Sequence, residues 1–386
     1  MVRAAAKNWA FVAVAVEPAR YAEIADALDE NGGALGMSMR RELAHTAFQH
    51  TAEYDAAISA YFARTTQSAE RFDLPDLDAL PREELRYGEN PHQRAILLRT
   101  SDAFKTLHGK ALSYNNLLDL SAAVGVIGAF RHADPTVAIL KHTNPCGVAT
   151  RGSLSDAYDA AFATDRQSPF GGIVVVNQPL TMEAAQKIDA VFTELVIAPS
   201  YEDGVLDFLM EKQNRRLIEM LTWAGETDAL DLRSVAGGIL VQDADPVLAP
   251  ASKLRADWTI ASKRQPTESE WADLDFAWRV AKHVKSNTIV YAKDQATMGI
   301  GAGQMSRIDS AEISASKAAK SGLDLTGAVV ASDAFFPFAD GLLAAAGEGI
   351  RAVVQPGGSI RDEEVIAAAD AHDLAMVFTG KRHFRH

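Results

Sequence analysis

A lysine and a histidine stand side by side at the end of an apolar run in "VAILKHTNPCGVA", residues 137–149. Lys141 is a fixed cation, and the imidazole of His142 changes its charge near neutral pH, so the pair suits proton transfer beside a positive charge. The run "TVAIL" predicts a buried strand at 136–140, and α/β sheets form their sites where strands end. The alternative is a pair that only caps the strand in solvent, and these residues alone leave it open.

The next residues, 144–147, predict a turn that contains the only cysteine of the chain. A histidine close to Pro-Cys suggests the zinc site of nucleoside deaminases, whose signature is H-x-E with P-C-x-x-C. Thr143 and Asn144 follow His142, so the catalytic glutamate is missing, and Cys146 has no second cysteine to pair with. We therefore predict no metal site, and we expect Cys146 to be a small buried turn residue rather than a nucleophile.

Other loops carry groups that bind anions. Arg86, a bidentate partner for phosphate, stands next to Tyr87 in "LRYGENPHQ" (85–93). An ordinary surface turn is the favoured interpretation of this segment when it is taken alone. "QPGGSIRDEE" (355–364) predicts a strand, a glycine loop and a helix start, where free backbone N–H groups can bind an anion. The final "TGKRHFRH" is basic and aromatic.

The stretch "GIGAGQMSR" (299–307) ends with Arg307 at a predicted helix start. Its three glycines let the backbone approach a ligand or cross another element closely, and both interpretations stay open. Gln304 stands where a dinucleotide-binding loop needs its third glycine, so a dehydrogenase is excluded. The aromatic stretch "SDAFFPFADG" (332–341) offers a wall for a flat heterocycle or simple core filling, and core filling is the expectation for Phe336 and Phe338.

The composition limits the function classes. The chain has 386 residues, 38 basic and 51 acidic, with a formal net charge of -13, so its long-range field repels nucleic acids and anionic membranes. One cysteine cannot form a disulfide within the chain, which favours a reducing, cytoplasmic location. Apolar runs are too short for a membrane span. The early "FVAVAV" (11–16) resembles a signal peptide, but no cleavage pattern follows, and we predict a buried strand there.

Apolar runs alternate with helical patterns from residue 86 onward, which predicts an α/β fold with a largely parallel, buried sheet. A capping box formed by Thr267 and Glu270 marks one helix start. Before this region, residues 1–65 predict the strand above and then helices, and residues 66–85 predict a linker. The predicted strands are 136–140, 172–176, 194–198, 288–292, 328–332, 351–355 and 374–378, and the predicted helices include 155–165, 181–192, 268–284 and 361–372.

The ordered set of loops resembles one family. "RYGENPHQ", "LHGKALSYNN", "VAILKHTNPCGVA", "SPFGGIVVVN", "RSVAGG", "HVKSN", "GIGAGQMSR", "SDAFFPFADG", "QPGGSIRD" and "RHFRH" follow each other as in AICAR transformylase, the C-terminal part of the bifunctional AICAR transformylase/IMP cyclohydrolase of purine biosynthesis. This resemblance covers residues from about 80 to 386. Residues 1–65 resemble the tail of the cyclohydrolase domain, most of which is absent, so cyclohydrolase activity is not expected of this chain.

The resemblance implies a phosphoribosylaminoimidazolecarboxamide formyltransferase. The family transfers a formyl group from 10-formyltetrahydrofolate to the 5-amino group of AICAR, and FAICAR and tetrahydrofolate are the products. The amine is a weak nucleophile because its lone pair is delocalised, so attack needs proton removal and charge stabilisation. By resemblance His142 is the general base, Lys141 the electrostatic stabiliser and Asn287 the holder of the carboxamide or formyl group. A cation next to His142 favours its neutral, basic form.

The resemblance also assigns the binding residues. Gly341 departs from family members with asparagine at that position, which puts one folate contact in doubt. The residues implied for AICAR are Arg86, Tyr87, Gly171, Glu194 and Arg307, and those implied for the folate are Phe335, Asp340, Gly341, Arg382 and Phe384.

For the architecture, the resemblance implies two deaminase-like α/β/α units in tandem without zinc, at 86–265 and 266–386, after the short α/β remnant at 1–65. It implies a homodimer whose active sites draw on both chains, no nucleic-acid or membrane partner and no tightly bound cofactor; binding of a structural monovalent cation is left open. The competing hypothesis is a non-catalytic nucleotide- or folate-binding protein. Retention of Lys141, His142, Asn287 and Arg307 together argues against it.

Overall fold

The computed structural model describes all residues except 66–71, 73 and 225–229. The chain separates into two compact units, Met1–Leu74 and Pro75–His386. Seven residues of the predicted linker at 66–85 lie outside the described residues, and its last four residues form a strand instead. None of the described helices is both long and apolar enough to cross a membrane.

The first unit is helical. Its small core gathers Ala6, Ala44 and Ala47, with half-buried apolar side chains packed around them. The predicted strand at 11–16 is wrong: the segment has no strand partner among the described residues, and its side chains alternate between exposed and half-buried. The helical elements are α1 (Val2–Lys7), a 3-10 turn η1 (Pro18–Arg20), α2 (Tyr21–Glu30) and α3 (Met37–Thr65).

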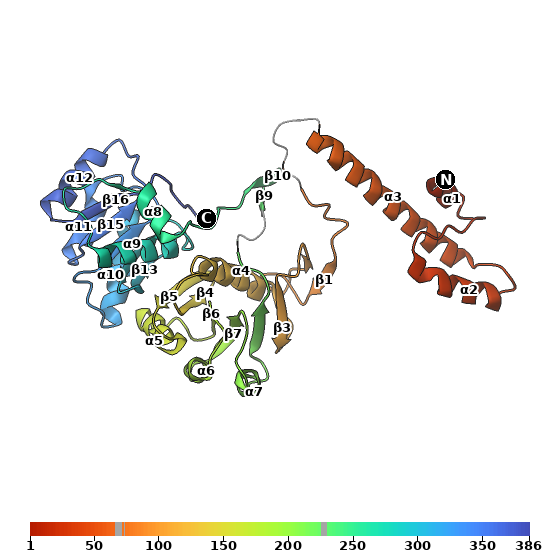
Figure 1. The fold of residues 1–386 in the computed structure, drawn as a ribbon, viewed down its shortest axis with the longest axis horizontal. Coiled ribbons are helices and arrows are strands. Elements are labelled where there is room, and N and C mark those ends of the chain that lie inside the picture. The colour runs from red at the N-terminus through yellow and green to blue at the C-terminus, as the bar shows by residue number, and fades with distance from the viewer. Residues whose placement is uncertain (66–71, 73, 225–229) are drawn as a thin grey trace. The chain divides into compact units, whose positions relative to one another are not determined.

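The second unit is built on a mixed sheet that has twelve strands among the described residues, in the order β11-β16-β15-β14-β12-β13-β5-β4-β6-β7-β8-β3 (Figure 1). Two separate hairpins, β1-β2 and β9-β10, complete the described strands. The strands are β1 (Arg82–Leu85), β2 (Ala95–Leu98), β3 (Phe104–His108), β4 (Thr136–Lys141), β5 (Asn144–Thr150), β6 (Gly172–Val176), β7 (Thr193–Ala198), β8 (Arg216–Met220), β9 (Leu230–Val235), β10 (Gly238–Asp243), β11 (Thr259–Ile260), β12 (Ile289–Lys293), β13 (Ala296–Gly301), β14 (Val329–Ser332), β15 (Ala352–Gln355) and β16 (Ala375–Phe378). The helices are α4 (Tyr114–Gly128), α5 (Leu154–Thr164), α6 (Met182–Asp189), α7 (Val205–Met210), α8 (Ala251–Asp257), α9 (Glu268–Ala281), α10 (Arg307–Lys320), α11 (Ala339–Gly347) and α12 (Asp362–Ala371).

The sheet consists of two halves with the same topology. Each half has a capped helix, an antiparallel hairpin, a second helix and then three parallel strands: α4, β4-β5, α5 and β6-β7-β8 in one, α9, β12-β13, α10 and β14-β15-β16 in the other. The predicted capping box of Thr267 and Glu270 is confirmed at α9, and Ser113 and Asn116 form the same box at α4. The halves meet where Ala296 of β13 pairs with Ala149 of β5.

A largely parallel sheet was the wrong prediction. Only β6-β7, β7-β8, β14-β15 and β15-β16 run parallel, and the other seven neighbouring pairs are antiparallel. The apolar runs were placed correctly because a buried strand is apolar in either direction. The missed strands β5 and β13 contain proline and glycines, which predict turns more readily than strands. Instead of a turn, residues 144–147 begin β5.

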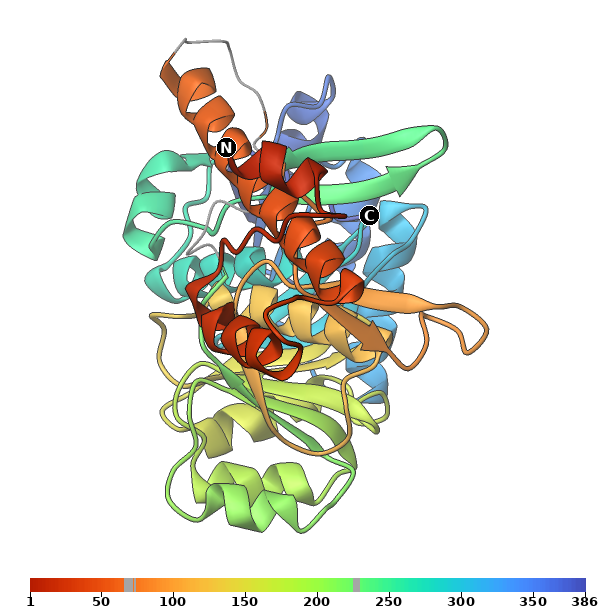
Figure 2. The same ribbon diagram turned by 90° about the vertical axis from the view of Figure 1, so that its right-hand side faces the viewer.

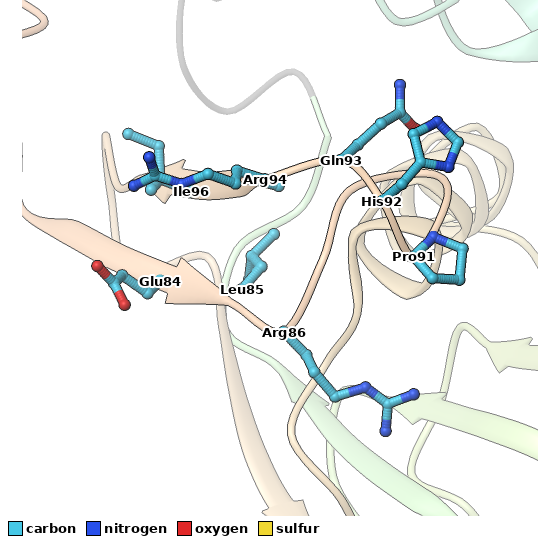
Figure 3. A pocket seen from close by; sticks show the side chains of 9 residues that line it. Glu84, Leu85, Arg86, Pro91, His92, Gln93, Arg94 and Ile96 are labelled. Carbon is cyan, nitrogen blue, oxygen red and sulfur yellow. The ribbon is translucent and has the colours of Figure 1, made fainter.

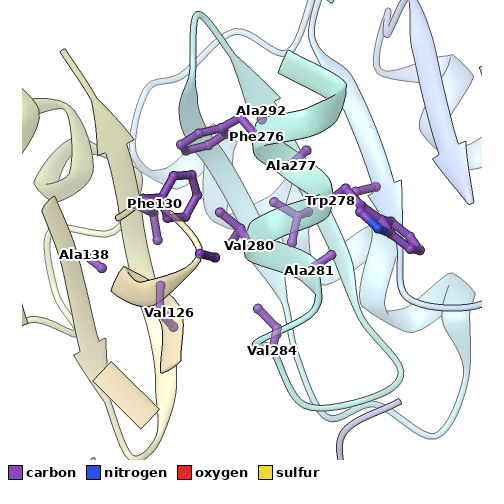
Figure 4. Packing of buried hydrophobic residues seen from close by; sticks show 14 of the residues in the cluster. Val126, Phe130, Ala138, Phe276, Ala277, Trp278, Val280, Ala281, Val284 and Ala292 are labelled. Carbon is purple, nitrogen blue, oxygen red and sulfur yellow. The ribbon is translucent and has the colours of Figure 1, made fainter. Parts of the chain in front are cut away.

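Three hydrophobic clusters place the helices on the sheet. One cluster joins α4 and α9 to alternate residues of the central strands, such as Ala138 and Val290, on one face across both halves (Figure 4). On the opposite face, α5, α6 and α7 cover the first half and α10, α11 and α12 cover the second. Alternate side chains of a strand point to opposite faces, so every central strand is buried on both sides. Figure 2 shows the same layers from the side.

Candidate functional site along one sheet edge

The predicted site residues lie near one row of strand ends of the twelve-stranded sheet, which we call the site edge of the sheet. Since β4 runs antiparallel to β6, the end of β4 meets the beginnings of β6, β7 and β8. Across the β5-β13 junction the same edge carries the beginning of β12 and the ends of β13 and β14. The predicted residues therefore lie at the carboxyl ends of the parallel strands in the second half only. In the first half the residues lie at the amino ends of the parallel strands.

Lys141 ends β4, and His142 is the first residue of the tight turn between β4 and β5. His142 and Thr143 have positive φ values of 50° and 65°, so this two-residue hairpin turn forces the imidazole out at the edge of the sheet. The His142 side chain is exposed, and its ring has no hydrogen-bond partner among the described residues. The Lys141 ammonium donates to the carbonyl oxygens of Phe170, at 3.0 Å, and Gly171, at 2.8 Å. One N–H of this ammonium is left for a ligand.

The side chains of Asp119 and Asn144 hold this turn in place, and the sequence alone did not indicate this role for either. A carboxylate oxygen of Asp119, on α4, accepts the N–H of Thr143 at 2.7 Å. Burial raises the pKa of Asp119, and the hydrogen bond from Thr143 opposes this rise. Asn144 donates to the carbonyl oxygen of His142 and accepts the N–H of Lys285 at 3.1 Å, so it ties the turn to the second half.

A pocket of about 520 Å³ in the first half collects three of the predicted AICAR residues, Arg86, Tyr87 and Glu194. Arg86 also lines a second pocket at the β1-β2 hairpin, which Figure 3 shows; there its side chain extends away from Gln93 and Ile96. Its guanidinium lies 4.6 Å from the centre of the Tyr87 ring and donates to the phenol oxygen at 3.0 Å. The exposed guanidinium therefore keeps donors for a phosphate group.

Glu194 is held in place at the floor of this pocket. One of its oxygens accepts from Arg216 at 3.0 Å and from Asn116 at 3.1 Å. Arg216 and Lys110 also line the pocket, so three cations surround one fixed carboxylate. A carboxylate beside cations suits a ligand that has both hydroxyl groups and a phosphate.

Gly171 connects this pocket to Lys141. Its φ of +66° disfavours side chains, and its N–H donates to the carbonyl oxygen of Phe192 at 2.7 Å. Phe192 lines the pocket, and its ring packs against the ring of Phe170 with centroids 5.3 Å apart. Both rings are largely exposed, at 50% and 68%, so they present an aromatic surface beside the ammonium group.

In the second half, Asn287 and Arg307 belong to one hydrogen-bonded network. Arg307 donates to Asn287 at 3.0 Å, to Asp333 at 2.8 Å and to the hydroxyl of Ser332 at 2.7 Å. Asp333 is fully buried, and its other oxygen accepts from Ser286. The amide of Asn287 donates to two main-chain carbonyls. The network fixes both predicted residues rigidly.

The residues predicted for folate lie in two segments. Phe335 is half-buried and Asp340 exposed, and Asp340 accepts the N–H of Gly341 at 2.7 Å at the start of α11. Phe336 is core, as expected, whereas Phe338 is 46% exposed and lies 4.6 Å from the guanidinium of Arg361, so that expectation was wrong.

Arg382 and Phe384 belong to the final segment, 381–386. The Arg382 guanidinium lies 4.6 Å from the centre of the Phe384 ring, and both line a pocket against the β9-β10 hairpin. The backbone N–H of His383, between them, donates to the carbonyl oxygen of Asp333 at 3.2 Å. The glycine loop predicted to bind an anion already binds a carboxylate of its own, because Asp362 accepts the N–H of Gly358 at 2.7 Å.

Cys146 is buried in β5 rather than in a turn. Burial raises the pKa of its thiol to about 12, which makes it a poor nucleophile. Across the described ranges, no group of three or more histidine, cysteine, aspartate or glutamate side chains is placed to hold a metal ion.

The structure does not unite all predicted residues within one chain. Six strand spacings separate β7, which carries Glu194, from β14, which precedes Asp333. At about 4.8 Å per strand this is roughly 29 Å along the edge. One nucleoside monophosphate does not span that distance. The pocket with Arg86 and the network with Arg307 are therefore separate groups in this chain, and Lys141 and His142 lie between them.

Comparison with known proteins identifies the family. The family model described as "AICARFT/IMPCHase bienzyme" matches residues 5–317. The bifunctional purine biosynthesis protein PurH of Chlorobium phaeobacteroides strain BS1 is 52% identical over 397 residues, with 100% of this chain and 75% of the relative covered. The PurH proteins of Chlorobaculum parvum and Chloroflexus aurantiacus are 51% and 52% identical, again over the whole of this chain and 75% and 74% of the relatives. The chain belongs to the AICARFT/IMPCHase bienzyme family.

Proposed function

We propose that this protein transfers the formyl group of 10-formyltetrahydrofolate to the 5-amino group of AICAR and releases FAICAR and tetrahydrofolate. Membership of the family gives the reaction class. The observation that carries the proposal is the turn at β4-β5, where an exposed imidazole that has no hydrogen-bond partner in the described part of the chain stands beside an ammonium held by two carbonyls. No resident cofactor is needed, because the folate is a co-substrate.

The chemical steps assign a task to each group. The amine nitrogen forms a bond to the formyl carbon, and the bond between that carbon and N10 of the folate breaks. The amine must lose a proton, which His142 takes directly or through the neighbouring carboxamide of AICAR. N10 gains a proton as it leaves. The remaining N–H of Lys141 stabilises the negative charge on the formyl oxygen or assists N10. Both N–H groups of the Asn287 amide already donate to main-chain carbonyls, so Asn287 orients the carboxamide through its amide oxygen.

The proposed AICAR contacts are divided between the pocket with Arg86 and the network with Arg307. Arg86 and Tyr87 bind the phosphate end of AICAR, Glu194 binds the ribose hydroxyls, and Gly171 brings its backbone close to the nucleotide. Arg307 is the fifth nucleotide residue, and its rigid network supports that role. For the folate we propose Phe335, Asp340, Gly341, Arg382 and Phe384; the glycine at 341 supplies no side-chain amide.

A homodimer with shared active sites agrees with the spacing of these groups. The roughly 29 Å between β7 and β14 exceeds what one AICAR molecule can bridge, so we propose that a second copy brings its Arg307 network to the Arg86 pocket. Light scattering at assay concentration tests this: a monomer with full activity would contradict it. The same topology supports the proposal that each half is a deaminase-like unit without zinc.

The decisive experiment measures tetrahydrofolate formation from 10-formyltetrahydrofolate with and without AICAR. We expect turnover only with AICAR, and a loss of roughly 10² to 10⁴ in kcat for His142→Ala with AICAR binding kept. Wild-type protein that binds both ligands without turnover would favour a non-catalytic binding protein. Full activity of His142→Ala would disprove the assignment of the base.

The second half of the sheet offers a matched control for Lys141. Lys293 ends β12 as Lys141 ends β4, and its ammonium donates to the carbonyl oxygen of Thr326 at 2.9 Å. Lys141→Met and Lys293→Met therefore remove structural hydrogen bonds of the same kind, two in the first variant and one in the second. We expect both to lower stability, by about 1 kcal/mol for each lost bond, and only Lys141→Met to lower kcat strongly. Equal effects on kcat would assign Lys141 a purely structural role.

A further inference from the structure

The final segment, 381–386, lacks helix and strand, yet it carries two of the proposed folate residues. Its residues are exposed except His383, which is 6% exposed, and the half-buried Arg385. Two main-chain bonds attach it: Ser286 donates to the carbonyl oxygen of Arg385 at 2.9 Å, and His383 donates to that of Asp333 at 3.2 Å. Near the end, the Arg385 guanidinium donates to the carbonyl oxygen of His283 at 2.6 Å, and Arg233 donates to that of His386 at 3.0 Å. The one deeply buried side chain of this segment is therefore an anchor.

His383 is anchored by Asp245, which follows the β9-β10 hairpin. The imidazole Nδ1 lies 2.6 Å from Oδ2 of Asp245, and the ring packs edge-on against Trp278 with centroids 5.3 Å apart. The ammonium of Lys282, near the end of α9, lies 2.8 Å from the same carboxylate oxygen and also donates to the carbonyl oxygen of Asp245. Asp245 thus joins the connection after β10, the helix α9 and the final segment.

The pKa shifts in this cluster indicate that Asp245 interacts strongly with His383 and Lys282. Burial alone would raise the pKa of Asp245, but hydrogen bonds from His383 and Lys282 outweigh it and lower the pKa to about 2. Burial lowers the pKa of Lys282, and the bond to Asp245 opposes that effect. The Lys282 side chain is 5% exposed and has no other carboxylate partner within the described parts of the chain. The carboxylate is therefore ionised at neutral pH, and its oxygen Oδ2 interacts with both His383 and Lys282.

We infer that Asp245 is a positioning residue for folate: by holding His383 it sets the place of Arg382 and Phe384. The inference rests on the proposed function. Since Arg382 and Phe384 flank the anchored residue, release of His383 loosens both side chains, while the bonds of Arg385 keep the end of the segment attached. The folate must then pay the cost of ordering them, and folate affinity falls while the pocket with Arg86 stays intact.

The test compares Asp245→Ala with the exposed, neighbouring Asp243→Ala as the matched control. For Asp245→Ala we expect KM for 10-formyltetrahydrofolate to rise about ten-fold or more and KM for AICAR to change by less than about two-fold. Trypsin should cleave after Lys381 and Arg382 at least about five-fold faster than in the control, because the anchored segment opens.

A double variant separates positioning from stability. Asp245→Ala leaves the buried ammonium of Lys282 without its partner, and Asp245→Ala with Lys282→Met removes that unpaired charge. We expect the double variant to recover stability and to keep the high folate KM. A wild-type folate KM in the double variant would overturn the inference.

The trypsin experiment needs no catalysis, so it separates this inference from the proposed function. Unchanged cleavage in Asp245→Ala would overturn the anchor even in an active enzyme. A wild-type protein without formyl transfer would refute the proposed function, and faster cleavage in Asp245→Ala would still support the anchor.

Discussion

Gly301→Ala tests whether the glycines of "GIGAG" serve a ligand or a crossing of two elements. A Cβ at Gly301 would lie 1.9 Å from the carbonyl oxygen of Ser310, whereas real contacts of this kind are not shorter than 3.0 Å. Both partners are backbone, so α10 must shift away from β13 by roughly 1 Å, an overpacking that costs about 3 kcal/mol. Gly301 has no positive φ, so sterics alone produce this cost. The shift also disturbs Asn287, whose carbonyl oxygen accepts from Ser310 at 2.6 Å.

Gly303→Ala is the matched control. Gly303 has a φ of +68° but no atom nearer than 3.9 Å to an added Cβ, so the change costs only about 1 kcal/mol of backbone strain. Urea unfolding, followed by the fluorescence of the buried tryptophans, measures both variants against wild type. We expect the midpoint of Gly301→Ala to fall much further than that of Gly303→Ala. A Gly301→Ala protein of wild-type stability that has lost only ligand binding would refute the steric argument and restore the ligand interpretation.

Predictions at three further residues follow from the described contacts. Cys146, whose buried thiol has its pKa raised to about 12, should react with a disulfide reagent at pH 8 only after unfolding, and Cys146→Ala should keep kcat within about two-fold. Asp119→Ala should lower kcat roughly ten-fold through loss of the acceptor for Thr143, whereas Asp119→Asn keeps an acceptor and most activity. Burial raises the pKa of the Asp119 carboxyl above its ordinary value of 3.8, so the folded protein holds this proton more tightly than the unfolded chain does. As the pH rises above 3.8, wild type should therefore lose stability relative to Asp119→Asn, which urea midpoints measure. Asp333→Ala should lower the free energy of unfolding by about 3 to 5 kcal/mol, since it leaves Arg307 largely buried without its carboxylate; a loss below 1 kcal/mol would contradict this.

The fold was predictable where burial determines composition. Runs such as 172–176 lie between two helix layers, so every residue is apolar, and this prediction is confirmed residue for residue by β6. The direction of a strand does not affect its composition in this way, which is why the antiparallel β4-β6 and β12-β14 pairs were missed. The segment 11–16 shows the opposite failure, because its unbroken apolar run fits a buried strand, yet it pairs with no strand in the described part of the chain.

The site was predictable as residue types but not as an arrangement. Arg86, Tyr87 and Glu194 do share a pocket, whereas Arg307 belongs to a different network. Sequence reasoning missed Asp333 although it directly follows a predicted strand, a position where polar residues signal a site. No sequence signal indicates that Asp119 reaches the turn, because its contact depends on how α4 packs on the sheet.

The repeated topology also shows which features of the site belong to the fold and which to its chemistry. In the second half, Asp273 of α9 accepts N–H groups from the turn after β12, as Asp119 of α4 does in the first half. Both turns have positive φ values, and both follow a lysine. These shared contacts support the hairpin itself. Both turn residues differ between the halves, and the difference that bears on proton transfer is at the first, His142 in one half and Asp294 in the other; a carboxylate at that place offers no neutral nitrogen base. The imidazole is therefore the feature of the turn that the fold does not require, which makes His142 the residue whose replacement should separate catalysis from stability.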